Sequence, residues 1–236
     1  MANFYKNIVD MFLEFCSTSS AKDIIEAVRV AEDIKNEFDA GHALIAASAK
    51  NKPDVISALI SAGMNVNAHS YEGDTPLMWA ALGNSEEAVD VLIRAGADIN
   101  ASRPDGLNAL IAAAKKNTPA VISRIIKAGA DISARDSNGM TALHHAAMNN
   151  PDTEAVKILI EAGAEDTATS TGKTALILAA MLNTPQTVMV LIDSGSDVNA
   201  KDSDGKTALD HARENPKISG TDVISVLERM TQKRGE

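Results

Sequence analysis

The sequence predicts an all-α solenoid of stacked helix-turn-helix units with protruding loops, and two observations support this. A short apolar phrase recurs down the chain, and its leucine returns every 33 residues, at Leu44, Leu77, Leu110, Leu143, Leu176 and Leu209. A second phrase, such as LIRAGADINA, follows each of the first five leucines. Self-similarity at a period of about 20–50 residues indicates stacked repeats, because one such unit cannot bury its apolar face alone. We number these units as repeats one to six, from Leu44 to Leu209.

Each repeat is expected to open with a short first helix. A residue with a side-chain oxygen precedes the apolar run, where it can accept hydrogen bonds from the free N–H groups of the first turn. In successive repeats this residue is Thr75, Asn108, Thr141, Thr174 and Thr207. The helix is rich in leucine and alanine. Because alanine side chains are small, we expect neighbouring first helices to pack closely.

The turn inside each repeat carries an asparagine and, in some repeats, a proline. The asparagine comes seven residues after the leucine, at Asn51, Asn84, Asn117, Asn150 and Asn183. Asparagine tolerates the left-handed conformation, so we expect it to end the first helix. Two residues later the chain has Pro53, Pro119 and Pro185. The first turn of a helix accepts proline, so these residues are expected to begin the second helix.

The second helix of each repeat is bulkier, as in VISALI and AVKILI, and is expected to be more fully buried. A glycine is expected to end it as a left-handed cap, at Gly63, Gly96, Gly129, Gly163 and Gly195. A polar extended segment such as DINASRPDG then leads to the next repeat. Repeat four has one extra residue before its glycine and one fewer after it, so we expect a misshapen loop there.

The phrases TPLMWAA, TALHHAA and the GADINA-type closures resemble the ankyrin repeat, whose pattern runs D-x-x-G-x-T-P-L-H-x-A-A and closes with G-A-D-x-N-A. The resemblance covers about residues 36 to 230. It implies that His144, on the family histidine, is buried in a hydrogen-bond network at a helix start. The family proline is replaced at Ala109, Ala142, Ala175 and Ala208. A tetratricopeptide array, with a period of about 34, is the alternative, but it lacks these glycine closures and loops.

Three parts are predicted along the chain. Residues 1–35 form a divergent N-terminal helical capping unit, residues 36–200 form five ankyrin-type repeats, and residues 201–236 form a divergent C-terminal capping repeat. Caps are expected because a stacked array leaves an apolar face open at each end. Apolar residues of the first part recur at helical spacing, at Tyr5, Ile8, Phe12 and Phe15. The same helix would also suit a segment that docks on a partner.

Composition and charge argue against several classes of partner. A formal net charge of -10 repels phosphate backbones and anionic lipids, so we expect neither a nucleic acid nor a membrane as partner. The single cysteine, Cys16, cannot make an internal disulfide. Asp10 and Glu14 interrupt the apolar N-terminus, which makes it a poor secretion signal. We expect a cytoplasmic, bacterial protein, although a secreted or periplasmic one with its signal removed would look the same.

Motifs for chemistry are missing from the sequence. No glycine-rich phosphate loop is found, and the glycines follow the repeat period instead. The neighbours His144 and His145 point to different sides of a helix, so a shared metal ion is not expected. Cys16 has no base partner that the sequence fixes. We therefore predict a protein that is not an enzyme and that uses no cofactor or metal. An enzyme with an unusual site in its groove is the alternative.

The resemblance implies a fold like a cupped hand, in which loop tips and first helices form the binding surface. We predict that the exposed positions of these elements bind a partner protein. They are Tyr71, Asp74, Leu82, Leu107, Lys115, Lys116, Arg135, Met140, Met148, Lys173, Met181, Leu182, Lys201 and Lys206.

Apolar and basic residues divide this predicted surface. Methionine and tyrosine suit adaptable contacts, and the late repeats are locally basic. We therefore predict a scaffold, adaptor or inhibitor that acts as a monomer and binds a partner with an acidic patch against repeats three to six. The alternative interpretation is purely structural: the methionines belong to the core, and the lysines face solvent without binding a partner. A further alternative is that the repeats are a structural or regulatory part of a larger protein or assembly.

Overall fold

The computed structural model of the chain describes residues 19–20, 22–23, 26, 40–50, 52–83, 85–116, 119–149 and 153–232. By its internal contacts the chain divides into an N-terminal unit, residues 1–113 with 127–130, and a C-terminal unit, residues 114–126 with 131–236. The helix predicted around Tyr5 to Phe15 lies outside the described residues. The predicted boundaries after residues 35 and 200 therefore stay predictions.

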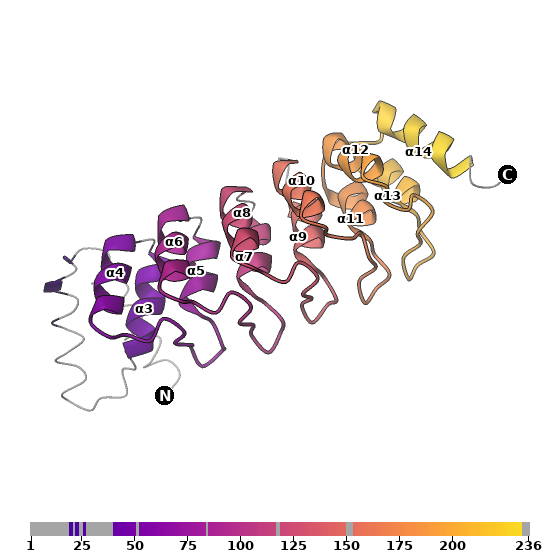
Figure 1. Cartoon of the computed structure of the whole chain (residues 1–236). Helices are drawn as coiled ribbons and strands as arrows, with labels where there is room; N and C mark the ends of the chain where they lie inside the picture. Colours follow the sequence, from indigo (N-terminus) through magenta and orange to yellow (C-terminus); the bar gives the residue numbers. More distant parts are fainter. Residues whose placement is uncertain are drawn as a thin grey trace. The chain divides into compact units, whose positions relative to one another are not determined.

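Two helices and a projecting loop make up each repeat (Figure 1). The N-terminal unit contains α3 (Ala40–Ala49), α4 (Pro53–Ser61), α5 (Pro76–Leu82) and α6 (Glu86–Arg94). Residues of both units contribute to α7 (Ala109–Lys116) and α8 (Pro119–Lys127). The C-terminal unit contains α9 (Ala142–Asn149), α10 (Glu154–Glu161), α11 (Ala175–Leu182), α12 (Pro185–Asp193), α13 (Ala208–Glu214) and α14 (Asp222–Gln232).

First helices pack on first helices, and second helices on second helices. In the N-terminal unit α3 packs against α5, and α4 against α6. In the C-terminal unit α11 packs against α9 and α13, while α12 packs against α10 and α14. The periodic leucines are buried in this stack, as are the alanines of the first helices, such as Ala80, Ala146 and Ala179. The predicted all-α stack of helix-turn-helix repeats is confirmed.

Most of the predicted helix starts are capped as expected. The Thr75 hydroxyl accepts the N–H of Met78 at 3.3 Å, and the Asn108 side chain accepts the N–H of Ile111 at 2.8 Å. Thr174 caps α11 in the same way, and Thr207 forms a reciprocal capping box with Asp210. Proline begins α4, α8 and α12, as predicted.

Asn183 ends α11 as predicted, but the left-handed conformation expected of it is wrong. Its backbone is extended, with φ -105° and ψ -154°, and so it is not in the left-handed conformation. Its buried amide instead donates to the Ala147 carbonyl of the preceding repeat at 2.7 Å and accepts the N–H of Thr184 at 2.8 Å. The side chain therefore links repeats, and the bonds it makes across the stack fix its backbone. The other four asparagines of the series lie outside the described residues.

Glycine ends the second helices as predicted, since φ lies between 87° and 96° at Gly63, Gly96, Gly129, Gly163 and Gly195. Repeat four departs from the others after its glycine. Asp166 stands where the preceding repeat has Ile132, and its carboxylate accepts the N–H groups of Ala175 and Leu176 at the start of α11. The irregular loop is thus used to hold the next helix.

Candidate partner-binding surface

Backbone hydrogen bonds join neighbouring loops of the C-terminal unit. The N–H of Ser170 donates to the carbonyl of Asn138 at 3.1 Å, and the N–H of Ser203 donates to the carbonyl of Thr171 at 3.0 Å. The loops approach so closely that a Cβ on Gly139 would lie 2.9 Å from the Ser170 nitrogen. The loops are therefore held at a fixed spacing, and a surface built on them is preorganised for binding.

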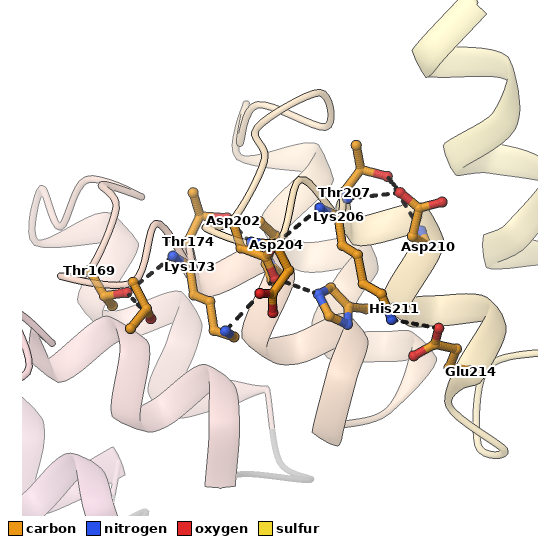
Figure 2. A network of polar contacts seen from close by, with 12 residues as sticks. Thr169, Lys173, Thr174, Asp202, Asp204, Lys206, Thr207, Asp210, His211 and Glu214 are labelled. Carbon is orange, nitrogen blue, oxygen red and sulfur yellow. Dashed lines mark hydrogen bonds and ion pairs between the residues drawn. The ribbon is translucent and has the colours of Figure 1, made fainter.

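The carboxylate of Asp202 accepts several hydrogen bonds at the base of the last loop (Figure 2). Its side chain is fully buried, and Oδ1 accepts the N–H groups of Asp204 and Lys206, both at 3.0 Å. Oδ2 accepts Nε2 of His211 at 2.8 Å and lies 3.8 Å from Nζ of Lys173. Burial would raise the pKa of Asp202, but the bonds from His211 and the backbone hold that pKa below its ordinary value. The negatively charged Asp202 therefore holds two consecutive loops, those of Lys173 and Lys206, against α13.

Repeat four contains the same kind of pair, two periods earlier. Oδ2 of Asp136 accepts Nε2 of His145 at 2.8 Å, and Oδ1 accepts the N–H groups of Asn138 and Met140 at 2.9 and 3.0 Å. Burial would raise the pKa of Asp136, but these bonds hold it below its ordinary value. Nδ1 of His145 is buried and has no partner among the described residues.

His144 is fully buried at the start of α9, as the family resemblance implied. Nδ1 accepts the N–H of Thr141 at 3.1 Å, and Nε2 donates to the carbonyl of Thr167 in the next loop at 2.7 Å. Burial lowers the pKa of His144 and also that of its neighbour His145. Both rings are therefore neutral structural groups that hold the loops.

Stability is expected to fall as the pH drops below about 6.5, because the unfolded chain then protonates histidines that the folded chain keeps neutral. His144 and His145 each contribute a slope of up to about 1.4 kcal/mol per pH unit between the ordinary histidine pKa and the lowered folded one. Urea unfolding at pH 7.5, 6.5 and 5.5 measures this slope, and His144→Gln should reduce it. Gly205 has φ +77°, so Gly205→Ala should be destabilised, but it keeps both rings and should retain the wild-type slope. An equal slope in His144→Gln would contradict this assignment.

The C-terminal unit carries all six basic residues of the predicted surface, and the structure engages three of them internally. The Arg135 guanidinium donates to the Gly139 carbonyl at 2.6 Å and to the Thr167 hydroxyl at 2.6 Å. Lys173 is paired with Asp202, as described above, and Lys206 with Glu214 at 2.7 Å. Of the six, Lys115, Lys116 and Lys201 have neither an ion pair nor a side-chain hydrogen bond among the described residues, and all three are exposed.

Apolar members of the predicted surface are partly exposed in this unit. Met140, Met148 and Met181 have intermediate burial, and Leu182 is 49% exposed. Met148 and Met181 lie near the ends of α9 and α11, which pack side by side. Met140 lies on the loop that precedes α9. The structure therefore brings these residues to one set of neighbouring elements.

Two predicted residues of the N-terminal unit are buried, contrary to the expectation that they are exposed. Asp74 is 6% exposed because the guanidinium of Arg103, on the next loop, pairs with it at 3.1 Å. Leu107 is 9% exposed and belongs to the core. Leu82 is partly exposed, and Tyr71 is fully exposed at its loop tip. Sequence reasoning missed Arg103, because only the neighbouring loop shows what it contacts.

Trp79, on α5, is an exposed residue that the sequence analysis did not select. The residue is 36% exposed, although the equivalent positions of repeats three to six are buried, at Ala112, His145, Leu178 and His211. Beyond residue 38 the chain has only two aromatic residues, Trp79 and Tyr71. Both are exposed in the same repeat, and aromatic residues are enriched in the contact surfaces of proteins. The scarcity of aromatic residues in this part of the sequence is the signal that could have identified Trp79.

A family model described as ankyrin repeats (three copies) matches residues 3–103, 95–170 and 151–227. The chain belongs to the ankyrin repeat family. The predicted ankyrin-repeat solenoid is thereby confirmed. Searching the curated proteins gives no match.

A solved structure also resembles this ankyrin repeat chain. It is the complex of the predatory endopeptidase Bd0816 from Bdellovibrio bacteriovorus with the immunity protein Bd3460. The similar chain in it has 30% sequence identity and a TM-score of 0.69, and the match covers 79% of the present chain and 97% of that one. The ankyrin repeat chain thus resembles a component of a protein–protein complex along almost the whole of that component.

The ankyrin repeats use their recurring polar residues inside the fold. Helix caps, buried Asp–His pairs and the asparagine links between repeats all make intramolecular bonds. No group of three or more metal-ligating side chains is found in the part of the chain that the structure describes. Within the same residues, no helix is long and apolar enough to cross a membrane. The predicted partner-binding positions, by contrast, vary from repeat to repeat.

Proposed function

We propose that this ankyrin repeat protein binds and inhibits a peptidase. The observation that carries the proposal is the similarity, at 30% identity, to a chain of an endopeptidase–immunity protein complex. Because that similarity covers 97% of the other chain, it includes the loops as well as the packed helices. Inhibition by a rigid repeat surface needs no catalytic group of its own, since the surface only has to cover the peptidase cleft.

The partner is proposed to contact the loop tips and the first helices. Aromatic and methionine side chains are the strongest anchors available there, namely Tyr71 and Trp79 in the N-terminal unit and Met140, Met148 and Met181 in the C-terminal unit. An interface depends mainly on a few such apolar anchors within a ring of polar contacts. The loops that carry Tyr71 and Met140 are braced by neighbouring loops, so little conformational entropy is lost on binding.

An acidic patch on the partner remains part of the proposal, with a narrower set of contacts. Arg135, Lys173 and Lys206 already have partners within the chain, so Lys115, Lys116 and Lys201 are the cations proposed to meet it. We further propose a cytoplasmic monomer. An inhibitor of this kind would protect the cell that makes the peptidase.

The triple substitution Met140→Ser, Met148→Ser and Met181→Ser should weaken partner binding at least about tenfold, because each change removes an apolar anchor. Wild-type and variant proteins are used as bait in an extract of the native source, and captured proteins are identified by mass spectrometry. We expect a peptidase to be captured by the wild type, and purified wild-type protein to suppress its hydrolysis of a peptide substrate.

A matched control tests whether the effect belongs to this surface. Lys157 and Glu161 are exposed on α10, a second helix, and replacing both by Ser should leave capture unchanged. Circular dichroism establishes that each variant is folded. Undiminished capture by the folded triple variant would exclude the proposed surface, and capture of a partner without peptidase activity would exclude the proposed function.

A further inference from the structure

A polar cleft of about 500 Å³ lies between the closing segments of repeats three and four. Ser133 lines one side of it, and Gly163 and Glu165 line the other. All of these residues belong to the C-terminal unit. The cleft is outside the methionine surface discussed above, and its origin is visible when the repeats are compared.

In the N-terminal unit an asparagine side chain fills the equivalent place. Nδ2 of Asn67 donates to the Gly96 carbonyl at 3.3 Å, and Oδ1 accepts the N–H of Asp98 at 2.7 Å. Repeat two makes the same contact, since Nδ2 of Asn100 donates to the Gly129 carbonyl at 3.2 Å. A carboxamide thus bridges each closing segment to the following one.

Repeat three has Ser133 at this position, 33 residues after Asn100. The backbone turn is the same, because the N–H of Ser133 bonds to Oδ1 of Asp131 at 2.9 Å, as the N–H of Asn67 bonds to Oδ1 of Asn65 at 2.9 Å. The short serine hydroxyl bonds to Asp131 at 2.7 Å, within its own turn. Repeat three therefore lacks the bridging carboxamide but keeps the backbone turn that positions it in the other repeats.

On the opposite side of the cleft, the backbone at Gly163 has the same conformation as the backbone that the asparagine bridge contacts at Gly96. Gly163 has φ 94° and Gly96 has φ 87°. The N–H of Ala164 bonds to the Leu159 carbonyl at 2.9 Å, and the matching bond of repeat two measures 3.0 Å. Among the described residues, no hydrogen bond is found for the Gly163 carbonyl or the Glu165 N–H. One acceptor and one donor are thus left at the spacing that an asparagine side chain bridges elsewhere in the same chain.

We propose that this cleft binds the carboxamide of an asparagine or glutamine side chain supplied by another peptide or protein. The amide oxygen accepts the N–H of Glu165, and the amide NH₂ donates to the carbonyl of Gly163. A carboxamide carries both functions, whereas an ammonium or guanidinium group has no acceptor for the Glu165 N–H. Arg135, which also lines the cleft, is held by Thr167 and leaves the bridge position open.

Titration of the ¹⁵N-labelled full chain with N-acetyl-L-asparagine methylamide tests the proposal. The Glu165 amide resonance should move and saturate, with a dissociation constant on the order of 10 mM, as expected for one small group with two hydrogen bonds. The leucine and arginine analogues should leave that resonance in place. Free L-asparagine carries the same side-chain carboxamide, so it should move the Glu165 resonance as well.

Two substitutions provide matched controls. Ser133→Asn supplies the bridge from within the chain, so it should abolish the Glu165 response and raise the urea midpoint of unfolding. Asn67→Ser makes the reverse change between repeats one and two, so the Asp98 amide should become responsive and the midpoint should fall. The proposal is overturned if the Glu165 amide does not respond, if it responds equally to the leucine or arginine analogue, or if the response persists in Ser133→Asn.

Discussion

Replacing Asp202 by alanine should lower the unfolding free energy of the C-terminal unit by about 2–4 kcal/mol, since buried donors are left without an acceptor. The carboxylate is fully buried and accepts the Asp204 and Lys206 N–H groups as well as the His211 ring. Alanine removes all of these bonds and leaves the Lys173 ammonium without its counter-charge. Urea unfolding followed by far-UV circular dichroism measures the loss.

Two further variants divide this effect between the loop and the helix. Asp202→Asn keeps an oxygen for the two backbone N–H groups but places an NH₂ group against the His211 ring, so an intermediate loss is expected. Asp204→Ala changes an exposed neighbour in the same loop and should cost under about 0.5 kcal/mol. Similar losses for Asp204→Ala and Asp202→Ala would show that the loop as a whole, and not this carboxylate, sets the stability.

Sequence reasoning predicted the features that a single repeat determines for itself. Thr75 caps its own helix, Gly63 ends its own helix and Pro53 begins its own helix. These requirements recur along the chain, the cap and the glycine about every 33 residues and the proline every 66, and so they are visible as a pattern. The periodic leucines are buried for the same reason. Local backbone geometry and period were enough to predict the all-α stack.

Side-chain contacts between repeats could not be predicted in this way. Asp74 was expected to be exposed, but its burial depends on Arg103 of the following loop. Lys173 was chosen as a free cation, yet Asp202 of the next repeat lies 3.8 Å from it. Asn183 matched a helix-ending pattern but bonds across the stack to Ala147. In each case the deciding partner lies 29 to 36 residues away, where its identity follows no period.

The division of residues between scaffold and surface follows from these contacts. Positions whose partners lie in the next repeat must be compatible with one particular neighbour, so they fix the order in which repeats can stack. Among the described contacts, neither Trp79 nor Tyr71 forms a side-chain bond to the next repeat. Both remain exposed in a chain that is only 3% aromatic. Retaining large aromatic groups where solvent contact is unfavourable is the pattern expected of a binding surface.

Gly139→Ala should lower the unfolding free energy of the C-terminal unit by about 2–4 kcal/mol, from two separate causes. The backbone has φ +72°, which any residue with a Cβ adopts at a cost of about 1–2 kcal/mol. The new Cβ would also lie 2.9 Å from the Ser170 nitrogen, which donates to the Asn138 carbonyl in the bond that joins two loops. The loops must separate to admit the methyl group.

Gly205→Ala isolates the first of these causes. Gly205 has φ +77°, and a Cβ there meets nothing within 4 Å. Its loss should be about 1–2 kcal/mol, and the difference between the two variants measures the contact between loops. If the contact matters for recognition as well as for stability, Gly139→Ala should weaken partner capture under conditions where it is still folded, whereas Gly205→Ala should not. Equal losses of stability in the two variants would mean that the loops of repeats four and five adjust freely to one another, and a preorganised surface would then no longer explain binding.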